Sequence, residues 1–192
     1  MTSPPEPRQK DVSVAGGGRS GVQAVFLVGF MGAGKSAVGQ ALSQRLGWRF
    51  EDLDQRIEAS QGRSIAEIFR QFGETGFRRL EHAALRSLLT DLRTTPTVAA
   101  LGGGAWVQPA NRALLAASAV PAVFLDAPVT ELWQRCLPER EQRPLLRDEK
   151  EFRQLYEARR PRYLEASLRV ETQGKAVGVI AAEVASGLHL GV

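Results

Sequence analysis

The sequence predicts a three-layer α/β/α protein in which helices cover both faces of a parallel β-sheet. Short, continuously apolar runs alternate along the chain with longer amphipathic segments. Strands that are apolar on both faces are typical of parallel sheets buried between two helical layers. Glycine-rich and charged motifs follow directly after several of these runs. Because ligands of such sheets bind beyond the carboxyl ends of the strands, these motifs are the candidate functional sites.

The apolar runs predict five strands, of which AVFLVGF and AVFLD are examples. The predicted strands span residues 24–30, 49–53, 97–101, 122–126 and 168–172. The segments between them have the spacing of helices, and one of these helices begins with SIAE, a capping-box pattern. The predicted helices span residues 35–46, 64–71, 74–91, 109–117, 128–137, 149–165 and 175–187. Pro161 interrupts the helix at 149–165, and we expect a kink there.

The composition predicts one globular domain, over residues 24–192, after a disordered tail. The chain has 192 residues, of which 43% are hydrophobic and 24% charged, as in ordinary globular domains. Residues 1–23 are rich in Pro, Gly, Ser and charge, which favours disorder; a transit peptide is the alternative, against which Glu6 and Asp11 argue. No apolar run approaches the roughly 20 residues of a membrane span. The single cysteine, Cys136, excludes an internal disulfide and suits a reducing cytosol.

Residues 29–36 read GFMGAGKS and match the pattern G-x-x-x-x-G-K-[ST]. The pattern lies between a predicted strand and a predicted helix, as a phosphate-binding loop requires. Its backbone amides and the helix N-terminus can hold the phosphates of a nucleoside triphosphate. We expect Lys35 to reach the β- and γ-phosphates and the Ser36 hydroxyl to bind Mg²⁺. A chance glycine-rich turn is the alternative, and many unrelated functions share this loop.

Two aspartates, Asp52 and Asp54, end the second predicted strand in FEDLD. Alternate residues of a strand share a face, so both carboxylates can point into one crevice. One could hold the metal, directly or through water, and the other could hold a hydroxyl in line with the γ-phosphate. Asp54 could instead cap a helix that begins at Gln55.

The segment GFRRLE places Arg78 and Glu81 three residues apart on one helix face, so that Glu81 can orient Arg78. An arginine held in this way presents a planar fork to a carboxylate or a phosphate. A solvated, salt-bridged face is the alternative, and Arg79 is assigned to that face. In ARRPRY, Arg159, Arg160 and Arg162 surround Pro161. One of them could turn inward, but periodicity alone does not select it.

Three glycines, Gly102, Gly103 and Gly104, follow the third predicted strand in LGGGA. Bare backbone beyond a strand end lets a ligand approach the main chain and use its amides, whereas a tight packing turn is the alternative. The polar residues 138–148 separate two predicted helices and could close as a lid that supplies an arginine to the transferring phosphoryl group. An exposed basic loop is the alternative. The arginines of this segment are Arg140, Arg143 and Arg147.

Together these segments resemble the shikimate kinase family. Five segments fall in the family's order and spacing: GFMGAGKS, the D-x-D of EDLD, GFRRLE, LGGGA, and RPLL with the later R-x-P-x-Y. The resemblance runs from about Ala24 to the C-terminus. It implies the nucleoside monophosphate kinase-like P-loop fold, with a five-stranded parallel sheet in the order 2-3-1-4-5. The implied reaction is ATP-dependent phosphorylation of the 3-hydroxyl of shikimate to shikimate 3-phosphate, in the chorismate pathway to the aromatic amino acids.

The resemblance also implies roles on the nucleotide side, with Mg²⁺ as the cofactor of ATP. Ser36 and Asp52 match the metal-side residues. Arg143 matches the lid arginine that reaches the phosphates, and Arg135 matches the residue that packs on adenine. The implied ATP-binding residues are Gly32, Ala33, Gly34, Lys35, Ser36, Ala37, Arg135 and Arg143. The implied catalytic residues are Lys35, Asp54 and Arg143.

On the acceptor side, Asp54 matches the aspartate that contacts the hydroxyls of shikimate. Arg78 and Arg159 match the two arginines that clamp its carboxylate, because R-x-P-x-Y selects Arg159 over Arg160. The three glycines of LGGGA match the lining of the shikimate pocket. The implied substrate-binding residues are Asp54, Arg78, Gly102, Gly103, Gly104 and Arg159, with Gly103 the most direct of the glycines.

Two other functions fit parts of the sequence. Gluconate kinases share the phosphate loop and a similar fold, but the paired arginines, LGGGA and RPLL favour shikimate. A nucleotide-dependent switch or nucleic-acid-binding NTPase would suit the net charge of +4 and the pI near 9.7. Its arginines would form a stripe with interleaved aromatic residues, whereas here they lie singly at strand-end motifs. We therefore expect ATP and shikimate as partners, no nucleic acid or membrane partner, a monomer, and a cytoplasmic location.

Overall fold

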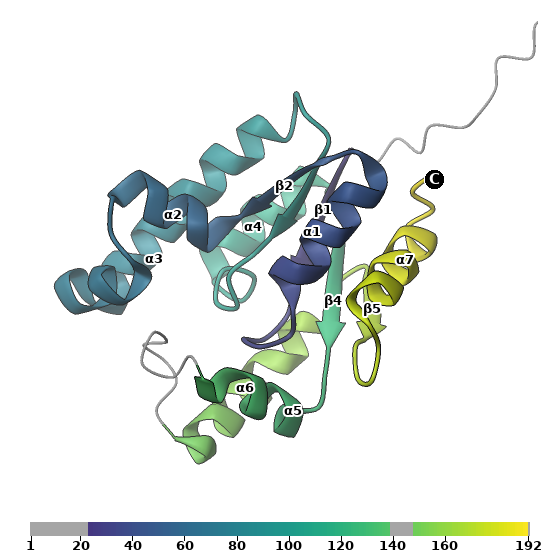
Figure 1. Ribbon diagram of the computed structural model, residues 1–192. Helices are drawn as coiled ribbons and strands as arrows, with labels where there is room; N and C mark the ends of the chain where they lie inside the picture. Colours follow the sequence, from purple (N-terminus) through teal and green to yellow (C-terminus); the bar gives the residue numbers. More distant parts are fainter. Residues whose placement is uncertain (1–22, 139–147, 192) are drawn as a thin grey trace, which may run out of the picture.

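The computed structural model of the chain describes residues 23–138 and 148–191, and every structural statement below refers to these ranges (Figure 1). The predicted N-terminal tail and the lid arginines Arg140, Arg143 and Arg147 lie outside the described residues.

Five strands form one parallel sheet in the order β2-β3-β1-β4-β5. The strands are β1 (Ala24–Val28), β2 (Arg49–Asp52), β3 (Thr97–Ala100), β4 (Ala122–Asp126) and β5 (Leu168–Glu171). The three central strands are buried at every position, while the edge strands β2 and β5 are partly exposed. This pattern explains the continuously apolar runs of the sequence, because both faces of a central parallel strand are covered. The predicted strand order is confirmed.

Helices flank the sheet on both faces. They are α1 (Lys35–Leu46), α2 (Leu53–Gln61), α3 (Ile65–Asp91), α4 (Pro109–Ser118), α5 (Val129–Cys136), α6 (Glu149–Tyr163) and α7 (Val177–Gly187). In Figure 1, α1 and α7 lie side by side on the nearer face, and α4, which packs against α3, lies behind the sheet. The helices α5 and α6 lie beyond the carboxyl end of β4. No helix in the described part of the chain is long and apolar enough to cross a membrane.

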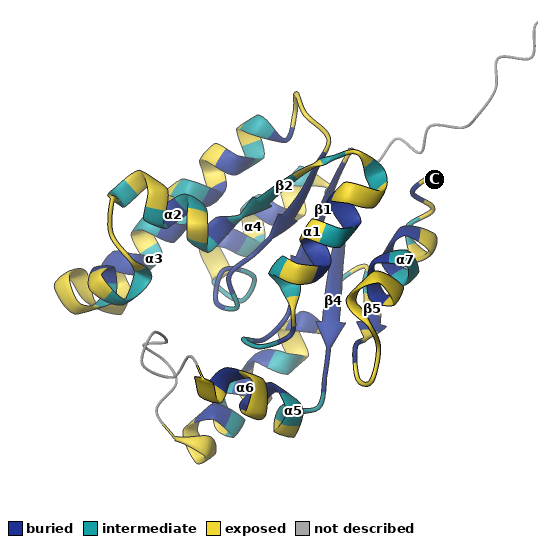
Figure 2. Cartoon of the chain, in the orientation of Figure 1, coloured by how far each residue is buried: buried dark blue, intermediate teal, exposed yellow. Residues whose placement is uncertain are grey.

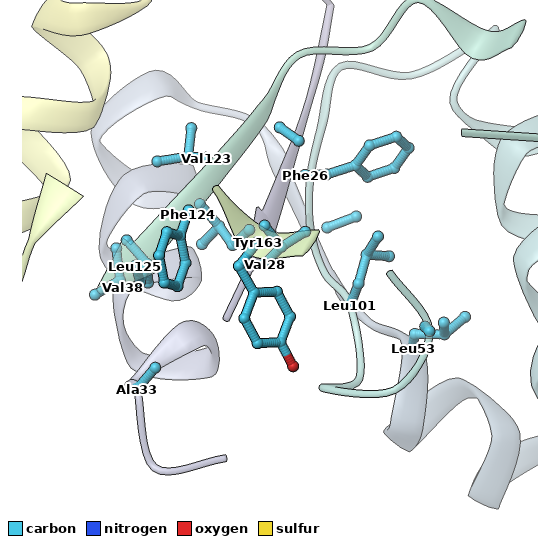
Figure 3. Packing of buried hydrophobic residues seen from close by; sticks show 14 of the residues in the cluster. Phe26, Val28, Ala33, Val38, Leu53, Leu101, Val123, Phe124, Leu125 and Tyr163 are labelled. Carbon is cyan, nitrogen blue, oxygen red and sulfur yellow. The ribbon is translucent and has the colours of Figure 1, made fainter. Parts of the chain in front are cut away.

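The hydrophobic core lies between the central strands and the helices that cover them. Buried positions follow the sheet and the inward faces of the helices (Figure 2). Phe26 of β1 and Phe124 of β4 are fully buried, and the ring of Tyr163 stacks on Phe124 with a centroid distance of 5.4 Å. Figure 3 shows these side chains in one apolar cluster, with the Tyr163 hydroxyl pointing out of it toward the loop after Leu101. The core therefore reaches the edge of the sheet where the sequence motifs lie.

Two elements differ from the sequence prediction. The helix α2 was not among the predicted helices and stood only as the alternative that begins at Gln55, because its only buried residues are Leu53 and Ile57 and the others are polar apart from Ala59. Its N-cap is Asp52, whose side chain accepts hydrogen bonds from the main chain; the alternative of an Asp54 cap is wrong. The predicted helices at 64–71 and 74–91 form one run, α3, interrupted at Gly73, where φ is 65° and ψ is −177°. Glycine suits this position because it adopts positive φ without a steric penalty.

Candidate active site

A cavity of about 840 Å³ lies at the carboxyl edge of the sheet. It is bounded by the phosphate loop, the ends of β2 and β3, the helices α2 and α3, and single arginines from α5 and α6. It is lined by Met31, Gly32, Gly34, Lys35, Ser36, Ala37, Asp52, Asp54, Gln55, Glu58, Ser64, Ile65, Ala66, Phe69, Phe77, Arg78, Glu81, Leu101, Gly102, Gly103, Gly104, Arg135 and Arg159.

The strand order explains why these segments meet. The strand β3 lies between β2 and β1, and its Ala100 is level with Asp52 on one side and Leu27 on the other. Because parallel strands end at the same edge, three loops leave this edge next to one another. The glycine loop after β3 therefore lies between the aspartates of β2 and the phosphate loop of β1.

The phosphate loop has the backbone that its glycines allow. Gly29 has φ 148°, and Gly34, the N-cap of α1, has φ 83°; L side chains rarely adopt such values. The loop curls around its own lysine, because Lys35 Nζ donates to the carbonyl oxygens of Gly29 at 3.1 Å and Phe30 at 3.0 Å. The first amides of α1 and the ammonium group thus lie together at a helix N-terminus, which favours a bound phosphate.

Ser36 and Asp52 form the oxygen pair that the metal prediction requires. The Ser36 hydroxyl donates to Asp52 Oδ2 at 2.6 Å. The other carboxylate oxygen accepts from the main-chain nitrogens of Asp54 at 3.0 Å and Gln55 at 3.4 Å, so the N-cap of α2 fixes the side chain. The described residues contain no cluster of three or more His, Cys, Asp or Glu side chains that could hold a metal. A hydroxyl and a carboxylate nevertheless fit Mg²⁺, which takes few protein ligands besides phosphate oxygens and water.

Asp54 lies in the cavity one residue into α2 and is partly buried. Burial first, and then the negative charge of Asp52, raise the pKa of its carboxyl to about 6. Lys35 and Arg78 act in the opposite sense, which places both cations near the same carboxylate. Asp54 is therefore a carboxylate between the phosphate loop and the arginine side of the cavity.

Arg78, which also lines the cavity, is fixed by two carboxylates of its own helix. Its guanidinium donates to both oxygens of Glu81, at 3.0 and 3.1 Å, and to Glu74 at 2.9 Å. The Glu81 side chain is only 1% exposed, whereas that of Glu74 is 54% exposed. Burial raises the pKa of Glu81 to about 7, although Arg78 lowers it. The fully solvated face that stood as the alternative is thus excluded for this pair, while Arg79 is exposed.

The arginines around Pro161 separate into three environments. Arg159 is buried, lines the cavity, and lies over the Phe30 ring with 5.9 Å between its guanidinium carbon and the ring centroid. Arg160 instead donates to Asp126 at 2.8 Å and to the Tyr156 hydroxyl at 3.0 Å. Arg162 pairs with Glu165 on the surface. The helix α6 continues through Pro161 to Tyr163, so the proline lies in its last turn and does not end it.

The three glycines leave room for different neighbours. A Cβ atom on Gly102 would lie 2.6 Å from Asp54 Oδ1, and one on Gly104 would lie 2.2 Å from Arg78 Nη1. A Cβ on Gly103 would meet no atom of the protein closer than 3.5 Å, which is ordinary van der Waals contact. A side chain at either outer glycine would therefore displace the aspartate or the arginine of the site, whereas one at Gly103 would make only ordinary contacts.

Arg135 reaches the cavity from α5. Its guanidinium donates to the Gly32 carbonyl oxygen at 3.3 Å and pairs with Glu131 one turn earlier. Beneath it, the backbone at Gly32 packs so closely that a Cβ there would lie 2.9 Å from Cys136 Sγ. The helix α5 thus supports the phosphate loop from the side on which Arg135 lies.

The structure brings together almost all of the predicted site residues that it describes. Ala33 is the exception, because it does not line the cavity and its side chain is buried in the core. Arg143 lies outside the described residues. Sequence reasoning missed one wall of the cavity, which contains Gln55, Glu58, Ser64, Ile65, Ala66, Phe69 and Phe77. The apolar spacing of Ile65 and Phe69 could have indicated an inward helix face, whereas Gln55 and Glu58 belong to the unpredicted helix α2.

A phosphate loop beside a polar acceptor cavity defines the class of protein as a small-molecule kinase with the P-loop fold. The family model for shikimate kinase matches residues 31–189. The shikimate kinase of Geobacter metallireducens is 43% identical over 173 residues, covering 88% of this chain and 94% of that protein. That of Persephonella marina is 37% identical over 161 residues, covering 83% of this chain and 95% of that protein. The chain belongs to the shikimate kinase family.

Solved structures agree with this assignment. The shikimate kinase of Acinetobacter baumannii in complex with shikimate superimposes with a TM-score of 0.82 at 36% identity, covering 88% of this chain and 94% of that one. A gluconokinase from Sinorhizobium meliloti gives a TM-score of 0.56 at 20% identity, covering 86% and 91% of the two chains. At this level of identity, the similarity to the gluconokinase shows only that the two proteins share a fold.

Proposed function

We propose that the protein transfers the γ-phosphoryl group of ATP to the 3-hydroxyl of shikimate, giving shikimate 3-phosphate and ADP in aromatic amino acid biosynthesis. One observation carries the proposal. Arg78 and Arg159, 81 positions apart in the sequence, line the same cavity as the phosphate loop and Asp54. A cavity lined by these two guanidinium groups and by a phosphate loop suits an anionic acceptor and an anionic donor. Membership of the shikimate kinase family supports the same reaction.

On the donor side, the amides of the phosphate loop and the N-terminus of α1 hold the phosphate groups of ATP. Lys35 leaves the carbonyl oxygens of Gly29 and Phe30 and contacts the β- and γ-phosphates, where it neutralises charge that develops during transfer. Arg135 packs on the adenine. Arg143, in the segment proposed as a lid, completes the charge neutralisation at the transferring group.

Ser36 and Asp52 hold the Mg²⁺ that accompanies ATP. Their oxygen atoms are the hard ligands that this ion prefers, and the cap of α2 keeps the aspartate in place. When bound at these residues, Mg²⁺ would supply positive charge that neutralises the phosphate groups. The contribution of the protein is the orientation of the two oxygen atoms at the edge of the phosphate loop.

On the acceptor side, Arg78 and Arg159 clamp the carboxylate of shikimate through charge-assisted hydrogen bonds. Gly103 has no side chain, so the ring can approach the main chain of the glycine loop and its amide groups. Asp54 binds the hydroxyl groups, orients the attacking one toward the γ-phosphate, and is placed to take its proton. Because phosphoryl transfer depends mainly on positioning and charge, these contacts suffice for the reaction class.

The acceptor preference tests the proposal directly. ATP consumption by the purified protein should be measured with Mg²⁺ and shikimate, quinate or gluconate as the acceptor. We expect rapid ADP formation with shikimate alone, and shikimate 3-phosphate as the product by mass spectrometry. Turnover with gluconate but not shikimate would overturn the assignment. A salt-sensitive shift of labelled RNA or DNA, together with nucleic-acid-stimulated ATP hydrolysis, would point to the NTPase alternative.

The proposal includes a monomeric enzyme in the cytoplasm that binds neither nucleic acid nor membranes. The buried single thiol of Cys136 suits a reducing compartment. Many of the arginines that raise the pI are paired with carboxylates, as in Arg56 with Asp91 and Arg169 with Asp126, and do not form a bare cationic stripe. Size-exclusion chromatography with light scattering measures the oligomeric state.

A further inference from the structure

The hydroxyl of Tyr163 connects two walls of the acceptor cavity. Tyr163 lies in the last turn of α6, is fully buried, and donates a hydrogen bond to the Gly103 carbonyl oxygen at 2.5 Å. Its ring is fixed by stacking on Phe124 of β4 (Figure 3). A buried tyrosine held by its ring and its hydroxyl places that hydroxyl at a defined point.

Arg159 lies four residues before Tyr163 and therefore on the same face of α6. The positive charge of Arg159 lowers the pKa of the Tyr163 hydroxyl, which indicates that the two groups lie close together. Burial raises the pKa of Tyr163 to about 12 in spite of Arg159, so the hydroxyl keeps its proton at neutral pH. A phenol has one proton to donate and lone pairs to accept. The Gly103 carbonyl oxygen accepts that proton, so the lone pairs of the hydroxyl remain for a donor such as the Arg159 guanidinium.

The Gly103 carbonyl and the Gly104 N–H belong to one trans peptide and point in opposite directions. Holding the carbonyl on Tyr163 therefore fixes the direction of the Gly104 N–H. Among the described residues, no hydrogen-bond acceptor is found for the N–H groups of Gly103 and Gly104. These amides remain available to an acceptor molecule, and their direction depends on the tyrosine.

We propose that Tyr163 is a positioning residue of the acceptor site, whose hydroxyl fixes the glycine loop and the Arg159 guanidinium relative to each other. The proposal rests on the proposed function, because its ligand is the shikimate carboxylate and ring. Tyr163 is not proposed to contact the transferring phosphoryl group. It aligns a main-chain amide and a guanidinium so that one rigid acceptor can meet both.

A second hydrogen bond between the same two segments provides a matched control. Trp106 Nε1 donates to the Arg162 carbonyl oxygen at 2.8 Å, so it also joins the glycine loop to the end of α6. Trp106 does not line the cavity. If Tyr163 only held the two segments together, loss of the Trp106 bond would have a similar effect on acceptor binding.

The test compares Tyr163→Phe with Trp106→Phe. Loss of the hydroxyl removes its hydrogen bond to the Gly103 carbonyl oxygen and its interaction with the Arg159 charge, which should weaken shikimate binding about 10-fold. We expect Tyr163→Phe to raise the Kd and KM for shikimate by this factor, with kcat and the Kd of ATP changed less than twofold. Trp106→Phe should leave shikimate binding within twofold of wild type. Replacement of Tyr163 by p-aminophenylalanine, which keeps a neutral donor at the same point, should restore most of the affinity.

A double-mutant cycle with Arg159→Lys isolates the coupling. In the Arg159→Lys background, Tyr163→Phe should cause only a small further loss of shikimate affinity. Additive losses, equal losses in the two phenylalanine variants, or parallel losses for ATP and shikimate would overturn the proposal. A Tyr163→Phe variant with wild-type shikimate affinity would also overturn it. A wild-type protein that neither binds nor phosphorylates shikimate would instead overturn the proposed function.

Discussion

The Arg78 guanidinium is bound to both carboxylate oxygens of a buried partner, Glu81, at 3.0 and 3.1 Å. The two residues are three apart on α3, and the Glu81 side chain is almost completely removed from solvent. A buried carboxylate that is paired in this way fixes the guanidinium plane, and truncation of one partner would leave an uncompensated charge. The free faces of the arginine are thereby directed to the cavity.

The first prediction concerns stability and pH. The pKa of Glu81 is raised from 4.5 to about 7 by burial in the folded protein. Between these values the folded protein binds more protons than the unfolded chain, so its stability falls as the pH rises. Relative to Glu81→Gln, the free energy of unfolding of the wild type should fall by up to about 3 kcal/mol over this range and level off above it.

Urea unfolding from pH 4 to 9 measures this difference. Asp54 has a raised pKa as well, but it titrates in both proteins and largely cancels in the comparison. Glu74→Gln is the matched control, since Glu74 binds the same arginine from an exposed position. A wild-type curve parallel to that of Glu81→Gln at every pH would show that the buried carboxyl does not titrate in this range.

The sequence predicted the parts of the site that depend on order along the chain. Continuous apolar runs locate the central strands, and the motifs after them lie at one edge because parallel strands end together. The location of Lys35, Ser36, Asp52 and the glycine loop at this edge follows from the rule, whereas their roles follow from the phosphate-loop pattern and the family resemblance. The rule places these residues without knowledge of any particular contact between distant parts of the chain.

The parts that sequence reasoning left open depend on residues far away in the chain. Arg159 and Arg160 are neighbours on α6, and periodicity did not select between them. The selection is made by Asp126 at the end of β4, which binds Arg160 at 2.8 Å and so leaves Arg159 for the cavity. The N-cap of α2 is Asp52 and not Asp54, because Asp52 accepts from the nitrogens of Asp54 and Gln55 while Ser36, 16 residues earlier, binds its other oxygen.

The second prediction concerns the phosphate loop. Lys35→Ala removes the ammonium group that the Gly29 and Phe30 carbonyl oxygens hold in the loop. We expect kcat to fall by at least about 100-fold, as for the loss of other preorganised charges, while the circular dichroism spectrum stays that of a folded protein. Lys175→Ala, which removes a surface lysine paired with Glu183, should leave kcat unchanged. A wild-type kcat in Lys35→Ala would contradict the proposed role of Lys35 in the phosphate loop.

The third prediction concerns Arg143, which lies outside the described residues. If this arginine contacts the transferring group, Arg143→Ala should lower kcat by up to about 10³- to 10⁵-fold, the range seen for arginines that act in phosphoryl transfer. The Kd of shikimate should change little. Arg153→Ala is the control, because Arg153 pairs with Glu149 on the surface of α6. A normal kcat in Arg143→Ala would assign residues 138–148 to an exposed loop.

The fourth prediction separates two neighbouring glycines. A methyl group at Gly103 would make ordinary contacts, none closer than 3.5 Å, so Gly103→Ala should keep its thermal stability and lose affinity for a ligand that packs on this main chain. Gly104→Ala collides with the Arg78 guanidinium and should displace it from Glu81. We therefore expect Gly103→Ala to weaken the binding of shikimate and of its CH₂OH analogue equally. Gly104→Ala should weaken mainly the binding of shikimate, which carries the carboxylate. Calorimetric titration with both ligands measures this, and the reverse pattern would contradict it.

The last prediction concerns the carboxylate clamp. Arg78 and Arg159 come from α3 and α6 and converge on one cavity. Lysine keeps the charge at each position but loses the planar fork that binds a carboxylate through two parallel hydrogen bonds. Arg78→Lys and Arg159→Lys should each raise the Kd of shikimate about 10- to 150-fold, which corresponds to the loss of one good charged hydrogen bond. The Kd of ATP should change less than twofold in either variant.

The analogue of shikimate with CH₂OH in place of the carboxylate distinguishes recognition from shape. It should bind weakly to the wild type, and neither substitution should weaken it much further. Arg160→Lys is the matched control, because Arg160 is adjacent to Arg159 but binds Asp126 outside the cavity. We expect it to leave the affinity for both ligands unchanged. Equal losses for shikimate and the alcohol in the Arg78 and Arg159 variants would mean that these arginines maintain the shape of the pocket and do not bind the carboxylate.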